Sequence, residues 1–299
     1  MNAATDTTTA DTRIAEPAKS AAKRPAAPTS IDENHLDESP RGLVIMAVVG
    51  VLVGILSGLF GIGGGTVIVP ALVWLGLTQR HAAATSMMAI VPTAVSGVAS
   101  YAFEGDVDWI AALIVFCGMF VGGQIGSWLL SKLPEIVLRW AFVVFLLFVM
   151  VNQAMSNPSR DSRIVMSVGT VIGLIAFGVI AGVLAGLLGI GGGAICVPAL
   201  SILFGASDLI ARGTSLLAMF PNAITTSVAN VRRRMVHVKA AVIIGVVAAL
   251  TAPFGTWLAA AVTPRAGAIM FTVYLGILLV RSVFVAMKAM KTTKTTRSR

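Results

Sequence analysis

Residues 50–72 read GVLVGILSGLFGIGGGTVIVPAL, and residues 178–200 read GVIAGVLAGLLGIGGGAICVPAL. Aligned without gaps, 15 of the 23 positions are identical. In each stretch an apolar run is interrupted by Gly-Ile-Gly-Gly-Gly and then continues as a shorter run that ends in Val-Pro-Ala-Leu. We call residues 61–65 and 189–193 the first and second glycine strings. The near-identity of the two stretches indicates an internal duplication.

The composition places the chain in a lipid bilayer. It is 57% hydrophobic and 12% charged, whereas soluble domains are about 45–50% apolar and about 25% charged. Residues 43–79 and 164–207 contain no Asp, Glu, Lys, Arg or His, and a spanning helix needs only about 20 apolar residues. The runs lack the alternation of a β-barrel. We therefore predict an all-α polytopic membrane protein with about 8–10 membrane segments.

Five apolar segments are expected in each half. The second segment of each set is too short to cross a bilayer comfortably at a rise of about 1.5 Å per residue. The expected segments are 42–60, 65–77, 82–102, 109–131 and 136–154 in the first half, and 164–188, 193–205, 210–230, 240–261 and 266–287 in the second.

This pattern divides the chain into two transmembrane repeats, residues 42–154 and 164–287, joined by a polar linker at 155–163. Residues 1–41, rich in Ala, Thr, Pro and charge, are expected to be a disordered cytosolic tail. Residues 288–299 are expected to be a basic cytosolic tail. The net charge of +9 comes from loops and tails, which fits a membrane protein and does not indicate a nucleic-acid partner.

The duplication continues beyond the glycine strings. Thr85-Ser86 matches Thr214-Ser215, and Pro92 matches Pro221. Gly126-Ser-Trp-Leu likewise matches a Gly-Thr-Trp-Leu segment in the second half. The repeat therefore covers nearly everything after residue 41.

Loop charges predict that the repeats have opposite orientations. The loop at 104–108 carries three acidic residues and no base, whereas its counterpart at 232–239 carries three Arg, one His and one Lys and no acid. Short basic loops stay in the cytoplasm, so matching loops are expected on opposite sides, with both termini cytoplasmic. An odd number of crossings per repeat gives this inversion. Five crossings satisfy it, as do three if each glycine string forms a re-entrant hairpin.

The glycine strings are the candidate binding site. A broken apolar helix at matching places in two halves is typical of the substrate site of a secondary transporter. Unwinding there frees backbone N–H groups, and the short segment that follows presents a helix N-terminus, which favours an anion. The candidate residues are Gly63, Gly64, Gly65 and Thr66 in the first half, and Gly191, Gly192, Gly193 and Ala194 in the second. Glycines spaced by four before each string fit close helix packing instead.

Polar side chains just after the short segments extend this candidate site. The hydroxyl pairs Thr85-Ser86 and Thr214-Ser215 are expected to donate to an oxyanion, although such hydroxyls often bond to their own i−4 carbonyl. Arg212 either attracts the anion or extends to the membrane surface. Asn222 either binds substrate or joins two helices by a hydrogen bond.

The chemistry that the sequence lacks also narrows the function. None of the expected spans contains Asp, Glu or His, so we expect no proton relay through the protein. There is no metal-ligand spacing and no nucleophile beside a base, so neither a cofactor nor enzymatic activity is expected. Two alternatives to anion transport remain: a scaffold or accessory subunit, and a metal or cation carrier that uses backbone carbonyls as ligands.

The doubled motif Gly-Leu-x-Gly-Ile-Gly-Gly-Gly with Val-Pro-Ala-Leu, each copy followed by Thr-Ser and a later Pro, resembles the TauE/SafE sulfite exporter family over residues 43–287. The resemblance implies a transporter in the bacterial inner membrane. It also implies export of small sulfur-containing anions such as sulfite and organosulfonates. The individual substrate, the direction of transport and homo-oligomerisation stay open.

Overall fold

The computed structural model describes residues 40–155 and 164–297. Nearly all of the expected N-terminal tail and of the expected linker between the repeats therefore lies outside the described residues.

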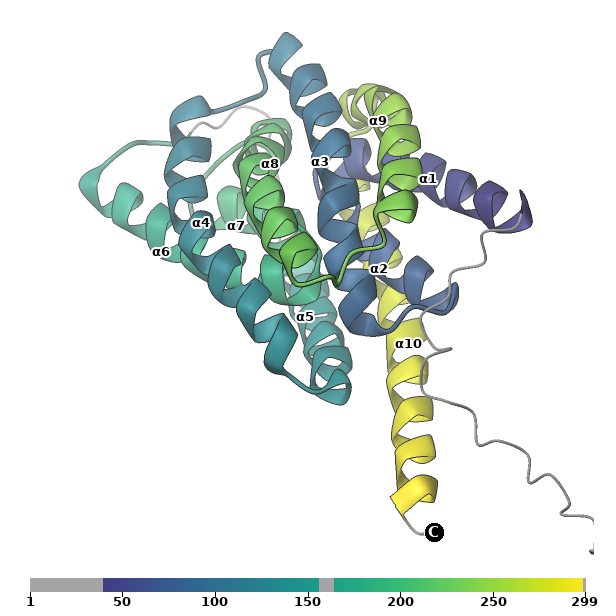
Figure 1. The fold of residues 1–299 in the computed structure, drawn as a ribbon. Helices are drawn as coiled ribbons and strands as arrows, with labels where there is room; N and C mark the ends of the chain where they lie inside the picture. The colour runs from purple at the N-terminus through teal and green to yellow at the C-terminus, as the bar shows by residue number, and fades with distance from the viewer. Residues whose placement is uncertain (1–39, 156–163, 298–299) are drawn as a thin grey trace, which may run out of the picture. The chain divides into compact units, whose positions relative to one another are not determined.

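The described residues form ten α-helices and no strand (Figure 1). This confirms the predicted all-α fold. Six helices are long and apolar enough to cross a membrane: α1, α3, α4, α6, α9 and the part of α10 up to Met287. The helices are α1 (Pro40–Phe60), α2 (Gly65–Trp74), α3 (Gln79–Phe103), α4 (Trp109–Lys132), α5 (Glu135–Met155), α6 (Val168–Leu188), α7 (Gly193–Ile202), α8 (Asp208–Arg232), α9 (Val238–Ala261) and α10 (Pro264–Arg297).

Each expected segment corresponds to one helix, but some ends differ. Helices α3 and α8 begin earlier than expected, at Gln79 and Asp208. The side chains of Thr78 and Ser207 accept hydrogen bonds from backbone amides in the first turns of these helices and so fix where they start. Helix α10 continues past residue 287 to Arg297, through most of the stretch expected to be a tail.

The first helix of each half packs along the fourth helix of the other half. A Cβ on Gly54 of α1 would lie 2.3 Å from the carbonyl oxygen of Ala248 in α9, and one on Gly122 of α4 would lie 2.1 Å from that of Val179 in α6. Only residues without a side chain permit this approach. The glycines spaced by four therefore serve helix packing, and the two halves are interleaved.

The order of the contacting residues along each pair of helices shows whether the two helices run parallel or antiparallel. Gly50, Gly54 and Gly58 meet progressively later residues of α9, so α1 and α9 run parallel. Helices α4 and α6 run parallel in the same way. By contrast, Gly97 of α3 meets Leu216 of α8, and Gly213 of α8 meets Tyr101. The matching helices α3 and α8 are therefore antiparallel neighbours.

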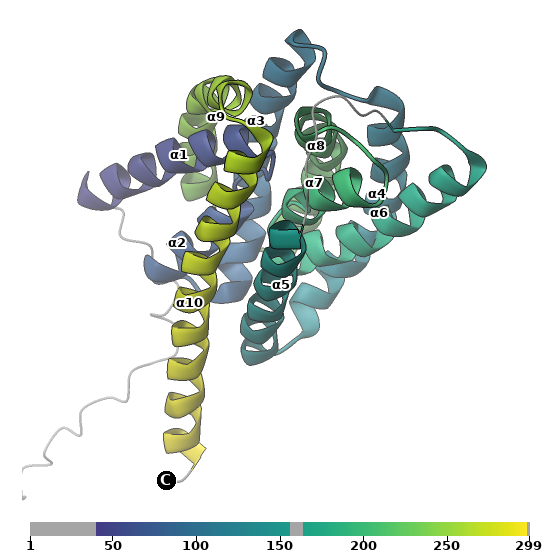
Figure 2. The same cartoon turned by 180° about the vertical axis from the view of Figure 1, so that it is seen from behind.

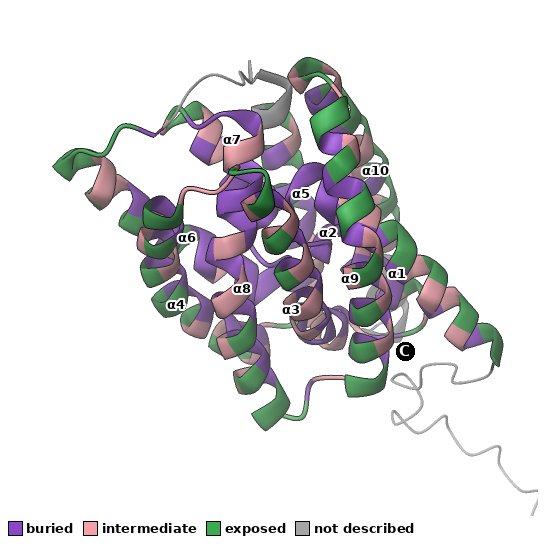
Figure 3. Ribbon diagram, turned by 90° about the horizontal axis from the view of Figure 1, so that it is seen from above, coloured by how far each residue is buried: buried purple, intermediate pink, exposed green. Residues whose placement is uncertain are grey.

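Buried residues concentrate on α2, α7 and the facing sides of α3 and α8 (Figure 3). Helix α10 runs along the outside of the helix bundle (Figure 2). Its exposed apolar side chains include Ile269, Val273, Ile277, Val280 and Phe284. An exposed apolar surface of this kind suits contact with lipid. The glycine strings therefore lie at the centre of a multi-pass membrane protein.

Candidate functional site

The half-helices α2 and α7 begin without side-chain caps. Their N-cap residues, Gly64 and Gly192, have φ values of 83° and 95°, and no side chain bonds to either helix start. Such positive φ angles favour glycine over residues that carry a Cβ. Helices α3, α4, α6 and α8 are all capped by a side chain. The first amides of an α-helix have no acceptor within it. Among the described residues, the first two N–H groups of α2 and of α7 have no hydrogen-bond partner, whereas the third donates to the carbonyl oxygen of the N-cap glycine.

The two glycine strings touch each other. A Cβ on Gly65 would lie 2.4 Å from the Cα of Ile190, and a Cβ on Gly193 would lie 2.7 Å from the Cα of Ile62. Each half-helix therefore starts directly against the string of the other half. The structure brings the predicted glycine positions of both repeats into one place.

Two matching side chains lie beside both strings. A Cβ on Gly63 would lie 2.0 Å from the methyl Cε of Met219, and a Cβ on Gly191 would lie 2.4 Å from the same atom. Ile90, the counterpart of Met219 in α3, lies close to both positions as well. The space next to the strings is therefore filled by apolar side chains in this conformation.

The threonine hydroxyls join helices to one another. Thr85 Oγ1 accepts a hydrogen bond from the backbone N–H of His237 at 3.0 Å, and Thr214 Oγ1 accepts one from that of Asp108 at 2.9 Å. The first bond therefore fixes the start of α9 against α3, and the second fixes the start of α4 against α8. Thr66 Oγ1 accepts from the Tyr274 hydroxyl at 3.0 Å. None of these three bonds is the i−4 bond considered from the sequence.

The two serines of the hydroxyl pairs differ. Ser215 Oγ donates to the carbonyl oxygen of Gly61 in the first string at 3.3 Å. Ser86 is fully buried, and its hydroxyl has no partner among the described residues. Ser86 therefore retains a hydrogen-bond donor inside the protein.

Arg212 does not extend to the membrane surface. Its side chain is 7% exposed and donates from Nη1 to the carbonyl oxygen of Leu59 at 2.7 Å. Its Nη2 lies 3.4 Å from a carboxylate oxygen of Asp208, whose side chain is 4% exposed. A cation at the C-terminus of a helix is favourable, and Arg212 occupies that place at the end of α1.

Asp208 lies two residues before the segment expected at 210–230. Because α8 begins at Asp208, a buried carboxylate lies within one of the helices. The expectation of no proton relay rested on expected spans without acidic groups, and α8, which begins with Asp208, is not among the six candidate spans.

Ala194 and Asn222 are both fully buried. Asn222 lies one turn after Met219 on α8, and its Nδ2 has no partner among the described residues. Its Oδ1 accepts a long bond from Thr226 Oγ1 at 3.5 Å. Asn222 therefore offers a buried donor close to the strings.

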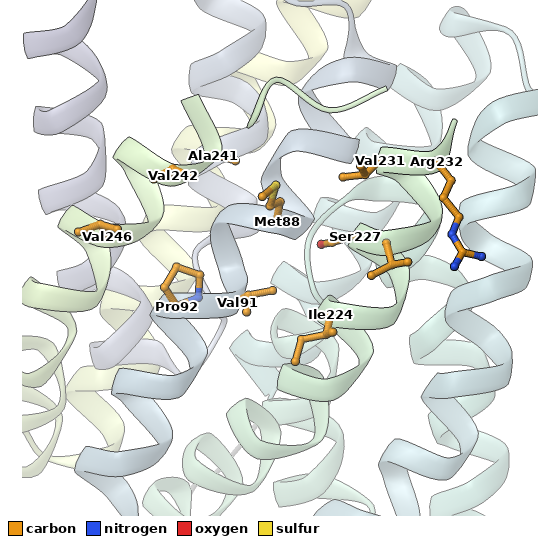
Figure 4. A pocket seen from close by; sticks show the side chains of 11 residues that line it. Met88, Val91, Pro92, Ile224, Ser227, Val231, Arg232, Ala241, Val242 and Val246 are labelled. Atoms are coloured by element: carbon orange, nitrogen blue, oxygen red, sulfur yellow. The ribbon is translucent and has the colours of Figure 1, made fainter. Parts of the chain in front are cut away.

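A cavity of about 530 Å³ lies between α3, α8 and α9 (Figure 4), and no residue of either glycine string lines it. Its lining is mostly apolar, with Ser227 and Arg232 as the polar exceptions. None of the residues predicted for the site lines it. Among the described residues there is also no cluster of three or more His, Cys, Asp or Glu that could hold a metal ion.

The family described as "Sulfite exporter TauE/SafE" matches residues 20–153 and 174–299. The chain belongs to this family. The match comes in two segments that correspond to the two halves, which supports the internal repeat. This transporter family and the six candidate spans together establish a multi-pass membrane protein.

Curated relatives carry transporter names. The "Probable membrane transporter protein YunE" of Bacillus subtilis is 29% identical over 212 residues, which cover 62% of this chain and 77% of that protein. A probable membrane transporter protein of Xylella fastidiosa (strain Temecula1) is 27% identical, with 66% and 77% coverage. The MJ0441 protein of Methanocaldococcus jannaschii, similarly named, is 29% identical, with 54% and 62% coverage. No solved structure gives a significant match.

Sequence reasoning missed Met219, Ile90 and Asp208. The first two follow only from contacts between the halves, which no local pattern reveals. Asp208 had a signal, because it follows the helix-capping residue Ser207 and precedes Arg212 by four positions.

Proposed function

We propose that this protein is a secondary transporter that exports small sulfur-containing anions, such as sulfite or organosulfonates, by alternating access between its two halves. One observation carries the proposal: two uncapped half-helices begin at glycine strings that contact each other at the centre of the protein. The family, a family of membrane transporters, supports the transport role.

The physical basis is the charge at a helix start. The aligned peptide dipoles place about half a positive charge at each N-terminus. Two such termini, together with unused N–H groups, hold an oxyanion without a buried Lys or Arg. Ser86 and Asn222 add neutral donors nearby.

Helix directions support the opposite orientation of the repeats. Thr85 bonds to His237, and Ser96 donates to the carbonyl oxygen of Ala249, so α3 runs parallel to α9. Helix α1 also runs parallel to α9, so α2 must return between α1 and α3. Each half then makes an odd number of crossings, five if α1 and α2 both span or three if they form a re-entrant hairpin, and an odd number inverts the second half. With the basic loop at 232–239 inside, both termini are cytoplasmic, in a bacterial inner membrane.

The two alternatives fit less well. A scaffold has no need for uncapped half-helices that meet at the centre. A cation carrier would use carbonyls at the ends of the broken helices, yet those of Leu59 and Gly61 already accept hydrogen bonds from Arg212 and Ser215.

Uptake into proteoliposomes tests the proposal. Purified protein is supplied with sulfite, thiosulfate, sulfate, taurine or sulfoacetate, and initial rates are compared with those of empty liposomes. We expect protein-dependent transport of sulfite or of a sulfonate. Transport of none of these anions, or of a metal cation in their place, would refute the proposed function.

Met219 is expected to limit the size of the transported anion, because its methyl group lies against both strings. Met219→Ala should raise transport of sulfoacetate relative to sulfite several-fold, measured in the same liposomes. It should also lower stability by about 2–5 kcal/mol, as buried Met→Ala changes do. Met46→Ala removes a comparably buried Met from α1 and should leave the ratio unchanged. Equal ratios in both variants would exclude this role for Met219.

A further inference from the structure

One face of α8 carries a buried polar row that the glycine strings do not explain. Asn222, Thr226 and Asn230 are spaced by four residues, lie on the same side of the helix and are all fully buried. They pack against α4, where Gly123 makes room for them. A Cβ on Gly123 would lie 2.2 Å from Asn222 Oδ1.

A hydrogen-bonded chain fixes how the Asn230 amide is oriented. Arg233 Nη1 donates to Ser127 Oγ at 2.7 Å, and Ser127 Oγ lies 2.7 Å from Asn230 Oδ1. Because Ser127 has one proton and already accepts from Arg233, it donates to Asn230 Oδ1. The Nδ2 of Asn230 points elsewhere and has no partner among the described residues.

The first half shows that the fold does not require these free donors. The counterpart of Asn222 is Thr93, whose hydroxyl donates to the carbonyl oxygen of Ala89 at 3.1 Å. The counterpart of Asn230 is Tyr101, whose hydroxyl donates to that of Gly58 at 2.6 Å. A buried donor without a partner raises the free energy of the folded protein. A ligand that accepts hydrogen bonds from the two amides of the second half would remove this cost.

We propose that the seam between α4 and α8 is a second anion subsite, in which the Nδ2 groups of Asn222 and Asn230 donate to the anion as it passes between the glycine strings and the Arg232–Arg234 loop. This inference rests on the proposed function. Asn222 lies one turn from Met219, at the string end of the row. Asn230 is two turns further, about 12 Å along the axis at 1.5 Å per residue.

The chemistry of the row suits passage rather than tight binding. Neutral amides stabilise an anion without burying a fixed charge, so release stays rapid. Arg233, exposed at the end of the row, supplies a positive potential that attracts anions to it.

Asn230→Asp separates binding from packing. Aspartate keeps the acceptor for Ser127, and the unfolding temperature of the purified variant reports the cost of burying its charge. The substitution removes the donor and adds a negative charge, so initial sulfite uptake should fall about tenfold or more. A purely structural role for Asn230 would lower the unfolding temperature but leave the uptake rate per folded protein unchanged.

Asn222→Leu and Thr93→Val form a matched pair at corresponding positions. Asn222→Leu should reduce sulfite uptake about tenfold, and Thr93→Val should stay within about twofold of wild type because its hydroxyl bonds only within α3. Wild-type uptake in both Asn230→Asp and Asn222→Leu, with Gly65→Ala inactive, would overturn the second subsite and leave the proposed function intact. A wild-type protein that moves no sulfur anion would overturn both.

Discussion

Replacing either Gly65 or Gly193 by Ala is expected to abolish sulfite uptake. A Cβ on Gly65 would lie 2.4 Å from the Cα of Ile190, and one on Gly193 would lie 2.7 Å from the carbonyl oxygen of Gly61. These neighbours are backbone atoms, which cannot rotate away, so the two strings must separate. Overpacking of this kind costs about 1–3 kcal/mol, which most membrane folds survive. The binding site would be lost, because it requires the two strings to be in contact.

Gly105 and Gly205 provide the matched controls. Their φ angles are 78° and 70°, yet an added Cβ would meet nothing within 4 Å. Gly105→Ala and Gly205→Ala therefore carry backbone strain of about 1–2 kcal/mol without separating the strings, and should transport sulfite normally. The measurement compares initial sulfite uptake rates of the string variants and the control variants at equal amounts of reconstituted protein. Substantial uptake by Gly65→Ala and Gly193→Ala would show that the glycine strings do not form the binding site.

The second large effect is expected at Arg212. Arg212→Met leaves the Asp208 carboxylate buried without its guanidinium partner and leaves the carbonyl oxygen of Leu59 without its donor. Breaking a buried ion pair by removing one partner costs about 3–5 kcal/mol. Unfolding of the purified protein in detergent measures this loss.

The double variant Asp208→Asn/Arg212→Met tests the cause. Removing both charges should recover most of the lost stability, because the penalty arises from a buried carboxylate that has lost its guanidinium partner. Arg139→Met provides a control, since the Arg139–Glu135 pair is more exposed and should contribute at most about 1 kcal/mol. A double variant as unstable as Arg212→Met would show that the Asp208 carboxylate is not the source of the lost stability.

The sequence predicted the helices well because the decisive signals are local. Charge-free runs marked the membrane segments, and the glycine strings marked where α1 and α6 end. The roles of Thr85 and Thr214 could not be predicted, because their hydroxyls bond to the starts of helices in the other half. The contact of Met219 with both strings also depends on how the halves interleave. The matching of α3 with α8 was visible in the sequence, whereas their direct antiparallel contact was not.

The central claim is that both glycine strings form one anion site, and binding stoichiometry tests it most directly. Equilibrium dialysis of radiolabelled sulfite against purified wild-type protein should give one anion per chain. Gly65→Ala alone and Gly193→Ala alone should each remove this binding completely. Two anions per chain in the wild type, with one retained in each variant, would contradict the account, because each string would then bind an anion independently.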